Sequence, residues 1–411
     1  MHLSGKKYFI EKKLLQKRLF LYRNIIMVNM KNLRLFKNIE NAVFISRPNR
    51  FTILCNLNGK QIKAYLPNPG RLWELLLPGA PLFVEKTDKV ERKMPYTVVA
   101  VKKEGWPVML HTHKTNDAAR FLIENNQVPG LEGAIVIKKE IKKGRSRFDF
   151  LLRKGSLDIY LEVKSCTFFS NKVAMFPDAP TLRGKRHVDE LACISNKKTL
   201  GVVLFIINSS GPEFFVPDYH TDLNFSSSLY SARKKKMIIP LAIGWKNNLT
   251  LSAKTKLLKV PWSILKKEAI DAGSYILILR LSKKTSIEIG SLGKLKFNKG
   301  YYIYVGSAMK NLSARIERHK RLRKKLFWHI DYFRAKAEIS SVIPIRTSDD
   351  LECKLAGAMK KIADREILGF GSSDCSCRSH FFEMKANPVR ISSFQDFLQF
   401  FKMERLTKLM L

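Results

Sequence analysis

Short runs in which apolar and polar residues alternate, separated by turn residues, fill the chain between residues 38 and 111. Alternation of this kind predicts strands with one buried face. Two of the runs flank Asn58-Gly59, a dipeptide that favours a tight hairpin because both residues accept positive φ. About five short strands in one interval predict a small OB-like barrel over 38–111. The expected strands are 42–46, 51–56, 61–65, 82–85 and 96–101.

From residue 112 the pattern changes, and strand-like runs alternate with segments of helical period. Two of the runs are almost continuously apolar, which is typical of buried central strands. This alternation predicts a mixed α/β domain over 112–262, with Thr115 as the candidate cap of its first helix. The expected helices are 112–126, 182–194 and 223–236, and the expected strands are 135–139, 147–152, 157–165, 201–207 and 237–244.

A third unit is expected over 272–388, with strands at 274–281 and 300–305 and helices at 313–323 and 349–364. The segment 389–411 ends the chain as an apolar helix from 393, for which Ser393 and Asp396 are candidate capping residues. Its apolar face predicts that it docks either on the third unit or on another subunit, so a homodimer stays an open alternative. The whole chain is therefore predicted to be an α/β multidomain protein.

The charge of the chain narrows the class of partner. Its 75 Lys and Arg against 35 Asp and Glu give a net charge of +40, which suits a polyanion, most simply nucleic acid. A lysine-rich proteome, a ribosomal role and a membrane-surface role are the alternatives. No apolar run reaches the roughly 18 to 20 residues that span a bilayer, so no membrane partner is expected.

Residues 1–37 form a basic leader without the apolar core of a secretory signal. The leader is expected to be disordered or a frayed helix, or to result from a mis-assigned start codon, because Met27 and Met30 follow it. The 6 cysteines are unevenly spaced and do not form a disulfide framework. A cytoplasmic location is therefore expected.

Charges lie inside two apolar strands of the central domain, where Asp149 is in the first strand and Glu162 and Lys164 are in the second. Residues two apart on a strand share a face, so Glu162 and Lys164 point the same way. If residues 154–157 form the turn, Asp149 lies opposite Glu162. Paired carboxylates attract a divalent cation, and hard oxygen ligands favour Mg²⁺ or Mn²⁺. The alternative is a salt-bridge cluster without chemistry.

Long motifs around these residues resemble the sugar fermentation stimulation protein A family. The similarity covers residues 38–262 through LPNPGRL, SRFDFLL, YLEVKSCT and FPDAPTLRGKRHVDEL. The resemblance implies an OB-like domain, a domain similar to PD-(D/E)xK nucleases, and DNA binding tied to sugar utilisation. It assigns Asp149 as the first acid and Glu162-x-Lys164 as the second element, with Asp149 and Glu162 as metal ligands.

The chain departs from the nuclease pattern at three points. Phe148 replaces the proline before the first acid, and the literal Pro177-Asp178 follows the second element rather than preceding it. Many such nucleases carry a glutamate on the preceding helix, and here Glu124 is the acid near the end of that helix.

Several side chains near this centre are candidates for DNA binding. Arg183 and His187 lie four residues apart near the start of one helix, where a phosphate is favoured. The alternatives are that Arg183 pairs with Asp178, that His187 packs in the core, and that Pro-Asn-Pro-Gly is only a turn. The complete set of DNA-binding candidates in the first two domains is Asn68, Arg71, Arg147, Arg183 and His187.

The third unit resembles a small domain related to GIY-YIG nucleases, through GSYILIL, KGYYIYVGSA, ARIERH, FWHIDYF, LECKLA and GFGSSDCSCRSHFF. Ser274 and Val305 depart from the two signature triplets, and a His329-x-Asp331 pair is unusual for these nucleases. The resemblance implies a second catalytic set made of Tyr275, Tyr304, Arg315 and Glu352. Arg318 and His319 complete the DNA-binding candidates, within a basic surface suited to phosphate contact and stacking.

Cysteines near the end of the third unit have some metal-ligand character, in the form Cys375-x-Cys377-x-x-His380 with Cys353 as a fourth residue. The C-x-C spacing is tighter than in common zinc knuckles. A structural loop is therefore favoured over a zinc site or a redox role.

Together these patterns predict a DNA-binding protein with a Mg²⁺- or Mn²⁺-dependent site that cleaves phosphodiesters, as a metal-dependent endonuclease would. The rival hypothesis is a non-catalytic DNA-binding regulator of sugar-utilisation genes that keeps a nuclease fold. RNA stays open as an alternative partner, because barrels and stacking aromatics serve both nucleic acids.

Overall fold

The protein is described by a computed structural model over residues 33–87, 94–235 and 238–410. Most of the expected basic leader lies outside these residues, as do Lys236, Met237 and Leu411. Residues 33–37 pack onto the structure, since Phe36 is fully buried and Arg34 bridges to Thr250. Within the described ranges no helix is long and apolar enough to cross a membrane.

The N-terminal unit is a closed barrel, as predicted. Strands β1 to β5 lie in the order β3-β2-β1-β4-β5, and a parallel pairing of β3 with β5 closes the ring. Asn58 and Gly59 both have positive φ and turn β2 into β3, which confirms the predicted hairpin. A further strand, β6, pairs with β5 and was not predicted. The bounds are β1 (Ile39–Asn49), β2 (Thr52–Leu57), β3 (Lys60–Tyr65), β4 (Pro81–Lys86), β5 (Tyr96–Lys103) and β6 (Trp106–Met109).

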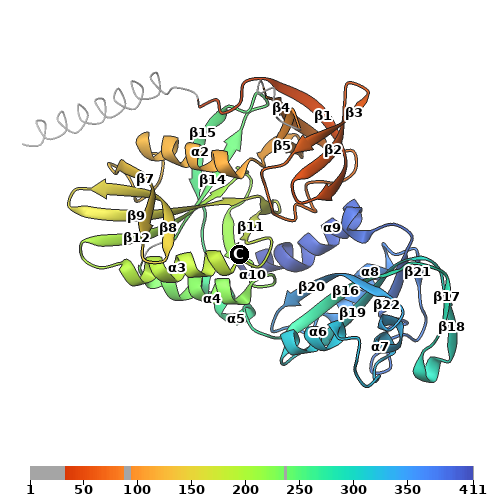
Figure 1. Ribbon diagram of the computed structural model, residues 1–411. Helices are drawn as coiled ribbons and strands as arrows, with labels where there is room; N and C mark the ends of the chain where they lie inside the picture. The colour runs from red at the N-terminus through yellow and green to blue at the C-terminus, as the bar shows by residue number, and fades with distance from the viewer. Residues whose placement is uncertain (1–32, 88–93, 236–237, 411) are drawn as a thin grey trace, which may run out of the picture.

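The central unit is a 6-stranded mixed sheet in the order β15-β14-β12-β9-β8-β7. Helix α2 covers one face, and α3 and α4 cover the other (Figure 1). Strand β12 is buried along nearly its whole length because it lies between two parallel neighbours, β9 and β14. The bounds are β7 (Ile135–Lys143), β8 (Ser146–Lys154), β9 (Leu157–Cys166), β12 (Thr199–Ile207), β14 (Ile238–Trp245), β15 (Leu251–Leu257), α2 (Thr112–Glu124), α3 (Leu182–Ile194) and α4 (Leu223–Ala232).

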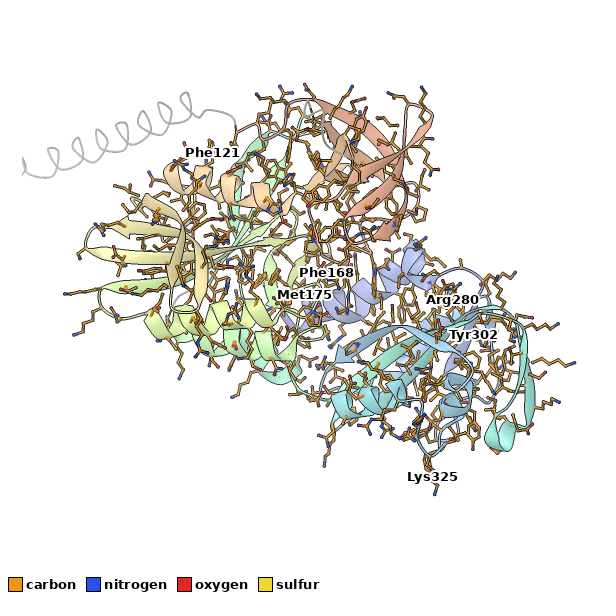
Figure 2. The ribbon with its side chains drawn as sticks, in the orientation of Figure 1. Phe121, Phe168, Met175, Arg280, Tyr302 and Lys325 are labelled. Atoms are coloured by element: carbon orange, nitrogen blue, oxygen red, sulfur yellow. The ribbon has the colours of Figure 1, made fainter. Side chains whose placement is uncertain are left out.

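A small second sheet, β10-β11-β13, lies beside the main one, and α5 follows it toward the third unit. These strands are too short for a periodicity signal, and the sequence did not predict them. Phe168 of β10 and Met175 of β11 lie where the central unit meets the end of the chain (Figure 2). The bounds are β10 (Phe168–Phe169), β11 (Val173–Phe176), β13 (Phe214–Pro217) and α5 (Trp262–Glu268).

The C-terminal unit is built on the sheet β20-β16-β19-β22-β21, with the hairpin β17–β18 at its side. The predicted basic helix ends at Lys320 and the next predicted helix covers only Glu352–Lys360, so both are shorter than expected. The bounds are β16 (Gly273–Leu281), β17 (Thr285–Glu288), β18 (Lys294–Phe297), β19 (Gly300–Ala308), β20 (Glu338–Arg346), β21 (Arg365–Glu366), β22 (Phe381–Met384), α6 (Leu312–Lys320), α7 (His329–Arg334) and α8 (Glu352–Lys360).

The tail joins the central and C-terminal units within one chain. Phe394 of helix α9 (Ser392–Gln399) packs on the C-terminal sheet. This contact confirms one of the two predicted docking modes, the one on the third unit. A π-helical turn, Phe400–Glu404, and α10 (Arg405–Met410) continue onto the central unit, where Leu406 joins the cluster around Met175. The buried pair Lys402–Asp218, at 2.8 Å, fixes that contact.

Two predicted helix caps are wrong. Helix α2 begins at Thr112 after His111, and Thr115 is buried inside the helix rather than capping it. Helix α9 begins after Ile391 without a side-chain cap, so Ser393 and Asp396 do not serve in that role. In both cases an apolar face packed by tertiary contacts determines where the helix starts.

Gly201 lies where β12 passes under α3, and we expect Gly201→Ala to destabilise the central unit by about 1–3 kcal/mol. A Cβ there would lie 2.8 Å from the carbonyl carbon of Leu191 and even closer to its oxygen, and backbone of this kind cannot move aside. Urea unfolding measures the loss. The matched control is Gly357→Ala in α8, where nothing lies within 4 Å and a gain of about 0.5–1 kcal/mol is expected. Equal effects in both variants would contradict the packing argument.

Candidate active site

The two central strands pair in the predicted register, although the ladder ends at Phe150 and Leu161, one pair short of Asp149 and Glu162. Phe150 pairs with Leu161 and Arg153 with Asp158, and the turn needs only Gly155 and Ser156 because both strands extend further than expected. Asp149 comes next along β8, where its Oδ2 accepts the Val163 N–H at 2.7 Å. The acids of the two strands are therefore brought to the same end of the hairpin ladder.

Glu162 is the centre of the polar contacts, although it is only 4% exposed. Its Oε1 lies 2.5 Å from Lys164 Nζ and 2.7 Å from Nδ1 of His187, which comes from α3. Arg183 Nε donates to the other ring nitrogen of His187 at 3.4 Å, so Nδ1 is the ring nitrogen that faces Glu162. Among the described residues, Glu162 Oε2 has no hydrogen-bond partner.

Asn116 of α2 completes the surroundings of Asp149, since its Nδ2 donates to Asp149 Oδ1 at 2.8 Å. Asn116 was not predicted from the sequence, because the nuclease pattern leads one to expect an acid, not an amide, on this helix. Glu124, the acid it considered, lies at the exposed end of α2 and pairs with Arg120 at 2.6 Å. The helix thus presents an amide, not a carboxylate, to the first acid.

The environments of the two acids push their pKa values apart. Burial, and then the charge of Glu162, raise the pKa of Asp149 above its ordinary value. Burial also raises the pKa of Glu162, but the contacts with His187 and Lys164 outweigh burial and lower it. Neighbouring carboxylates with separated pKa values are typical of sites that handle protons or cations.

Both acids open into a cleft of about 1040 Å³ at the junction of the three units. Its basic lining is contributed by the barrel, the central unit and the segment before α9. The basic residues that line it are Arg47, Arg50, Arg71, Lys164, Arg183 and Arg390. A groove with two acids at its floor and arginines along its walls suits a phosphodiester backbone.

The LPNPGRL loop is both a turn and a wall of this cleft. Asn68 is buried, accepts from Gly70 N at 2.9 Å and donates to the Leu110 carbonyl at 3.0 Å. The backbone N–H of Arg71 donates to Asp178 at 2.8 Å, which leaves the Arg71 guanidinium over the Trp73 ring. Arg47, which sequence reasoning missed, binds three carbonyls of this segment, including that of Asn68 at 2.9 Å.

The structure brings only part of the predicted DNA-binding set to the cleft. Asn68, Arg71 and Arg183 line it, whereas His187 lies beneath it at 1% exposure and acts on Glu162. Arg147 lies on the surface away from the cleft and is 3.6 Å from Glu140.

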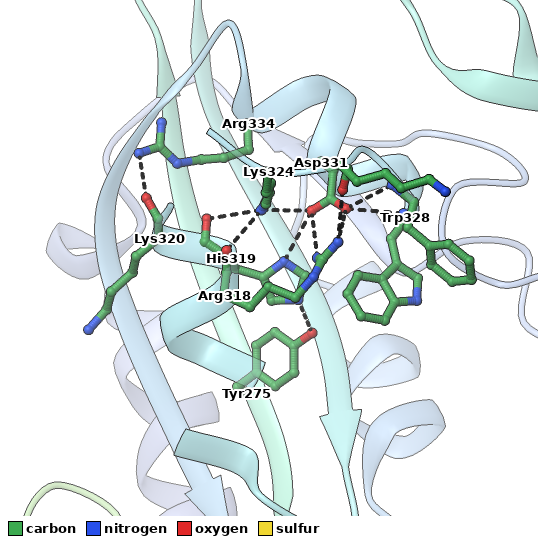
Figure 3. A network of polar contacts seen from close by, with 10 residues as sticks. Tyr275, Arg318, His319, Lys320, Lys324, Trp328, Asp331 and Arg334 are labelled. Carbon is green, nitrogen blue, oxygen red and sulfur yellow. Dashed lines mark hydrogen bonds and ion pairs between the residues drawn. The ribbon is translucent and has the colours of Figure 1, made fainter. Parts of the chain in front are cut away.

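A second polar network lies in the C-terminal unit (Figure 3). Its hub is Asp331, 1% exposed, which lies 2.7 Å from Lys324 Nζ and accepts from the Arg318 guanidinium at 3.0 and 3.2 Å. His319 lies between this acid and Tyr275, whose hydroxyl is 2.8 Å from its Nε2. His319 is therefore buried inside the unit, whereas the Arg318 side chain, although paired with Asp331, stays 28% exposed.

Tyr304 and Arg315 approach this network from neighbouring elements. Tyr275 and Tyr304 share one face of the β16–β19 pair, where Gly306 leaves room for the Tyr275 ring. Burial raises the pKa of both tyrosines, so both stay protonated near neutral pH. Arg315 stacks on Trp328 at 4.3 Å, while Glu352 is bonded to Ser307 and to His380.

Comparison with known proteins divides the chain in the same way. Residues 45–110 match the SfsA N-terminal OB domain, 113–247 the sugar fermentation stimulation protein RE domain, and 274–403 a domain of unknown function, DUF123. The sugar fermentation stimulation protein homolog of Methanothermobacter thermautotrophicus is 37% identical over 209 residues, 50% of this chain and 87% of that protein. The homolog of Methanosphaera stadtmanae is 38% identical over 231 residues, 54% of this chain and 96% of that protein.

A solved structure, that of Pyrococcus furiosus SfsA in complex with Ca²⁺, is similar in fold. The TM-score is 0.52 at 26% sequence identity, and the match covers 56% of this chain and 99% of that one. The OB barrel and the mixed α/β central unit are thus shared with that protein.

Proposed function

This chain belongs to the family of sugar fermentation stimulation proteins and carries a DUF123 domain over residues 274–403. From that premise we propose that it binds DNA in the cleft and cleaves its phosphodiester backbone. The site is formed by Asp149, Glu162 and Lys164, in a domain similar to PD-(D/E)xK nucleases. The observation that carries the proposal is that two carboxylates and a lysine from paired strands meet at the floor of an arginine-lined cleft.

The residues present fit a divalent cation. Glu162 Oε2 is buried without a partner among the described residues, and burial, followed by the nearby charge of Glu162, raises the pKa of Asp149. Carboxylate oxygens are the ligands that Mg²⁺ and Mn²⁺ prefer. The Pyrococcus furiosus relative has been solved with Ca²⁺, a cation of the same hard class. When bound, such an ion supplies a water of lowered pKa and neutralises phosphate charge.

The protein's own groups position the reaction. His187 and Arg183 form a chain behind Glu162 that holds its carboxylate toward the cleft. Asn116 and the Val163 N–H hold Asp149 in the same manner. Lys164, on the same face as Glu162, offers an ammonium to the charge that develops on the phosphate. Arg71 and Arg183 on the walls supply salt-sensitive contacts to neighbouring phosphates.

We also propose that the C-terminal unit has a GIY-YIG-like fold and binds DNA next to the cleft. Arg315 is held against Trp328 near the Tyr275–Tyr304 face, and the surrounding surface is basic. In this proposal the buried His319 stabilises that surface from within, while the partly exposed Arg318 contacts phosphate as predicted.

A non-catalytic regulator is the second candidate function. The observation in its favour is that Glu162 Oε1 is already bound by both Lys164 and His187, so this acid is partly satisfied without a metal. In that case the cleft would bind DNA and leave it intact.

The test is to incubate the purified protein with end-labelled single- and double-stranded DNA in Mg²⁺, Mn²⁺ or EDTA. We expect metal-dependent cleavage that Lys164→Met slows by about 100-fold, while DNA affinity changes little because one of many cationic contacts is lost. The matched control is Lys154→Met at the far end of β8, where the lysine is half-exposed beside Glu132. DNA that stays intact in every metal, with salt-sensitive binding retained, would leave the regulator as the function.

A further inference from the structure

A cluster of soft metal ligands lies in the C-terminal unit, apart from the acids of the cleft. One comes from the first turn of α8, and the others from the loop between β21 and β22. The members, called the Cys₃His cluster here, are Cys353, Cys375, Cys377 and His380. Their sulfur and imidazole nitrogen atoms all lie within 4.8 Å of one another.

These distances approach those of a tetrahedral zinc site. Zn–S bonds of about 2.3 Å and a Zn–N bond of about 2.05 Å set an edge of about 3.8 Å between two sulfurs and about 3.6 Å between sulfur and nitrogen. Cys375 Sγ lies 3.5 Å from His380 Nε2, which is already that edge. The remaining ligand atoms need to move by only about 1 Å to complete the tetrahedron.

The histidine is oriented as a zinc ligand would be. His380 directs Nε2 to Cys375, and its Nδ1 lies 3.0 Å from Glu352 Oε1. The other Glu352 oxygen accepts from the Ser307 hydroxyl, so the carboxylate is itself held in place. A carboxylate behind a histidine fixes the tautomer in which Nε2 is free to bind the metal. His380 is buried, so this arrangement is not a chance surface contact.

We propose that the Cys₃His cluster binds a zinc ion that ties the loop to α8. Thiolates and imidazole together select Zn²⁺ over the Mg²⁺ or Mn²⁺ expected at the acids of the cleft. Backbone hydrogen bonds close the base of the loop, from Gly369 to Arg378 and from His380 to Phe370, both at 2.9 Å. The ion would fix the loop beside Tyr304, whose ring lies 2.8 Å from the position that a Cβ on Gly371 would take.

The short C-x-C spacing alone favoured a structural loop over a zinc site. That spacing is unusual when only two cysteines are considered, but α8 supplies Cys353 from the opposite side. Glu352, which the nuclease resemblance places in a catalytic set, becomes a positioning residue for His380.

The experiment uses the full chain, purified under reducing conditions without added metal. Elemental analysis is expected to find about one zinc per chain, and replacement by Co²⁺ is expected to give thiolate-to-cobalt charge-transfer absorption. Cys377→Ser is expected to lose both signals. The matched control is Cys193→Ser, an exposed cysteine of the central unit, which is expected to keep both.

The zinc affinity of Glu352→Gln distinguishes the positioning role of this carboxylate from a folding defect. We expect it to keep zinc at saturation but to bind it about 10–100-fold more weakly, measured by competition with a chelator. A wild-type chain that takes up neither zinc nor cobalt would overturn the proposal, as would full zinc binding by Cys377→Ser. Neither result depends on whether the cleft cleaves DNA.

Discussion

Asp149→Asn is expected to lower metal-dependent DNA cleavage by about 1000-fold, the size of effect seen when a charge-stabilising group leaves a preorganised site. The amide has the same shape as the carboxylate, and its oxygen can still accept the Val163 N–H. What it loses is a negative charge beside Glu162, and with it a cation ligand. Initial rates of cleavage in Mn²⁺, at enzyme concentrations above the Kd for DNA, measure the loss.

Asp158→Asn is the matched control, because Asp158 lies on the same pair of strands and forms an exposed ion pair with Arg153 at 3.0 Å. It should cleave DNA like the wild type. DNA binding in EDTA should be unchanged or slightly tighter in Asp149→Asn, since a carboxylate repels phosphate. Equal loss of cleavage in the two variants would mean that the sheet, and not the site, had been damaged.

Asp149 also determines how cation affinity and cleavage are expected to depend on pH. Burial and Glu162 raise the pKa of Asp149, so protons compete with the cation at pH values where an ordinary aspartate is already ionised. Cation affinity and cleavage should therefore rise as the pH rises through this raised pKa. At higher pH the profile should level off. The metal concentration for half-maximal cleavage, measured at several pH values, tests this sign.

The central hairpin could be predicted from the sequence because local rules fix it. A tight turn at Gly155 and the alternation on both sides leave one register that buries Phe150 and Leu161 together. The partners of the acids could not be predicted. Asn116 and His187 reach them from helices on opposite faces of the sheet, and strand periodicity carries no information on that contact.

The cleft itself is a property of the whole assembly. Arg47 of β1 was not predicted because its role is to bind carbonyls of the Asn68 loop, a contact across the barrel. Arg390 reaches the cleft because the tail bridges two units through Lys402 and Asp218. Sequence patterns predicted that the tail docks, but its partner depended on a buried charge in the central unit that no local pattern reveals.

In the third unit, the sequence overestimates how many basic side chains are available to contact DNA. The run of basic residues in and after α6 was expected to face DNA, yet Arg318 and Lys324 converge on Asp331 within the unit. A buried acid collects cations because an unpaired charge in the interior is costly. Fewer of these basic residues are therefore available to contact a polyanion than their number in the sequence indicates.

Asp331→Asn should destabilise the C-terminal unit by about 3–5 kcal/mol, because it leaves several cations around a neutral amide. Lys324 is 7% exposed in its side chain and has little access to water as a substitute partner. The carboxylate also accepts the backbone N–H groups of Phe327 and Trp328 at the start of α7, so the variant weakens that helix cap. Thermal unfolding of the full chain, with hydrogen exchange followed in α6 and α7, measures the loss.

The matched control for this prediction is Glu317→Gln on α6, whose pair with Lys320 is half-exposed and should contribute less than about 1 kcal/mol. A pH series separates charge from packing. Burial raises the pKa of Asp331, but hydrogen bonds from His319, Arg318 and Lys324 outweigh it and lower the pKa well below its usual range. The stabilisation is therefore complete above the unfolded pKa of about 3.9 and is lost as the pH falls below it. Wild type and Asp331→Asn should thus converge in acid, whereas a constant difference between them at all pH values would assign the loss to packing alone.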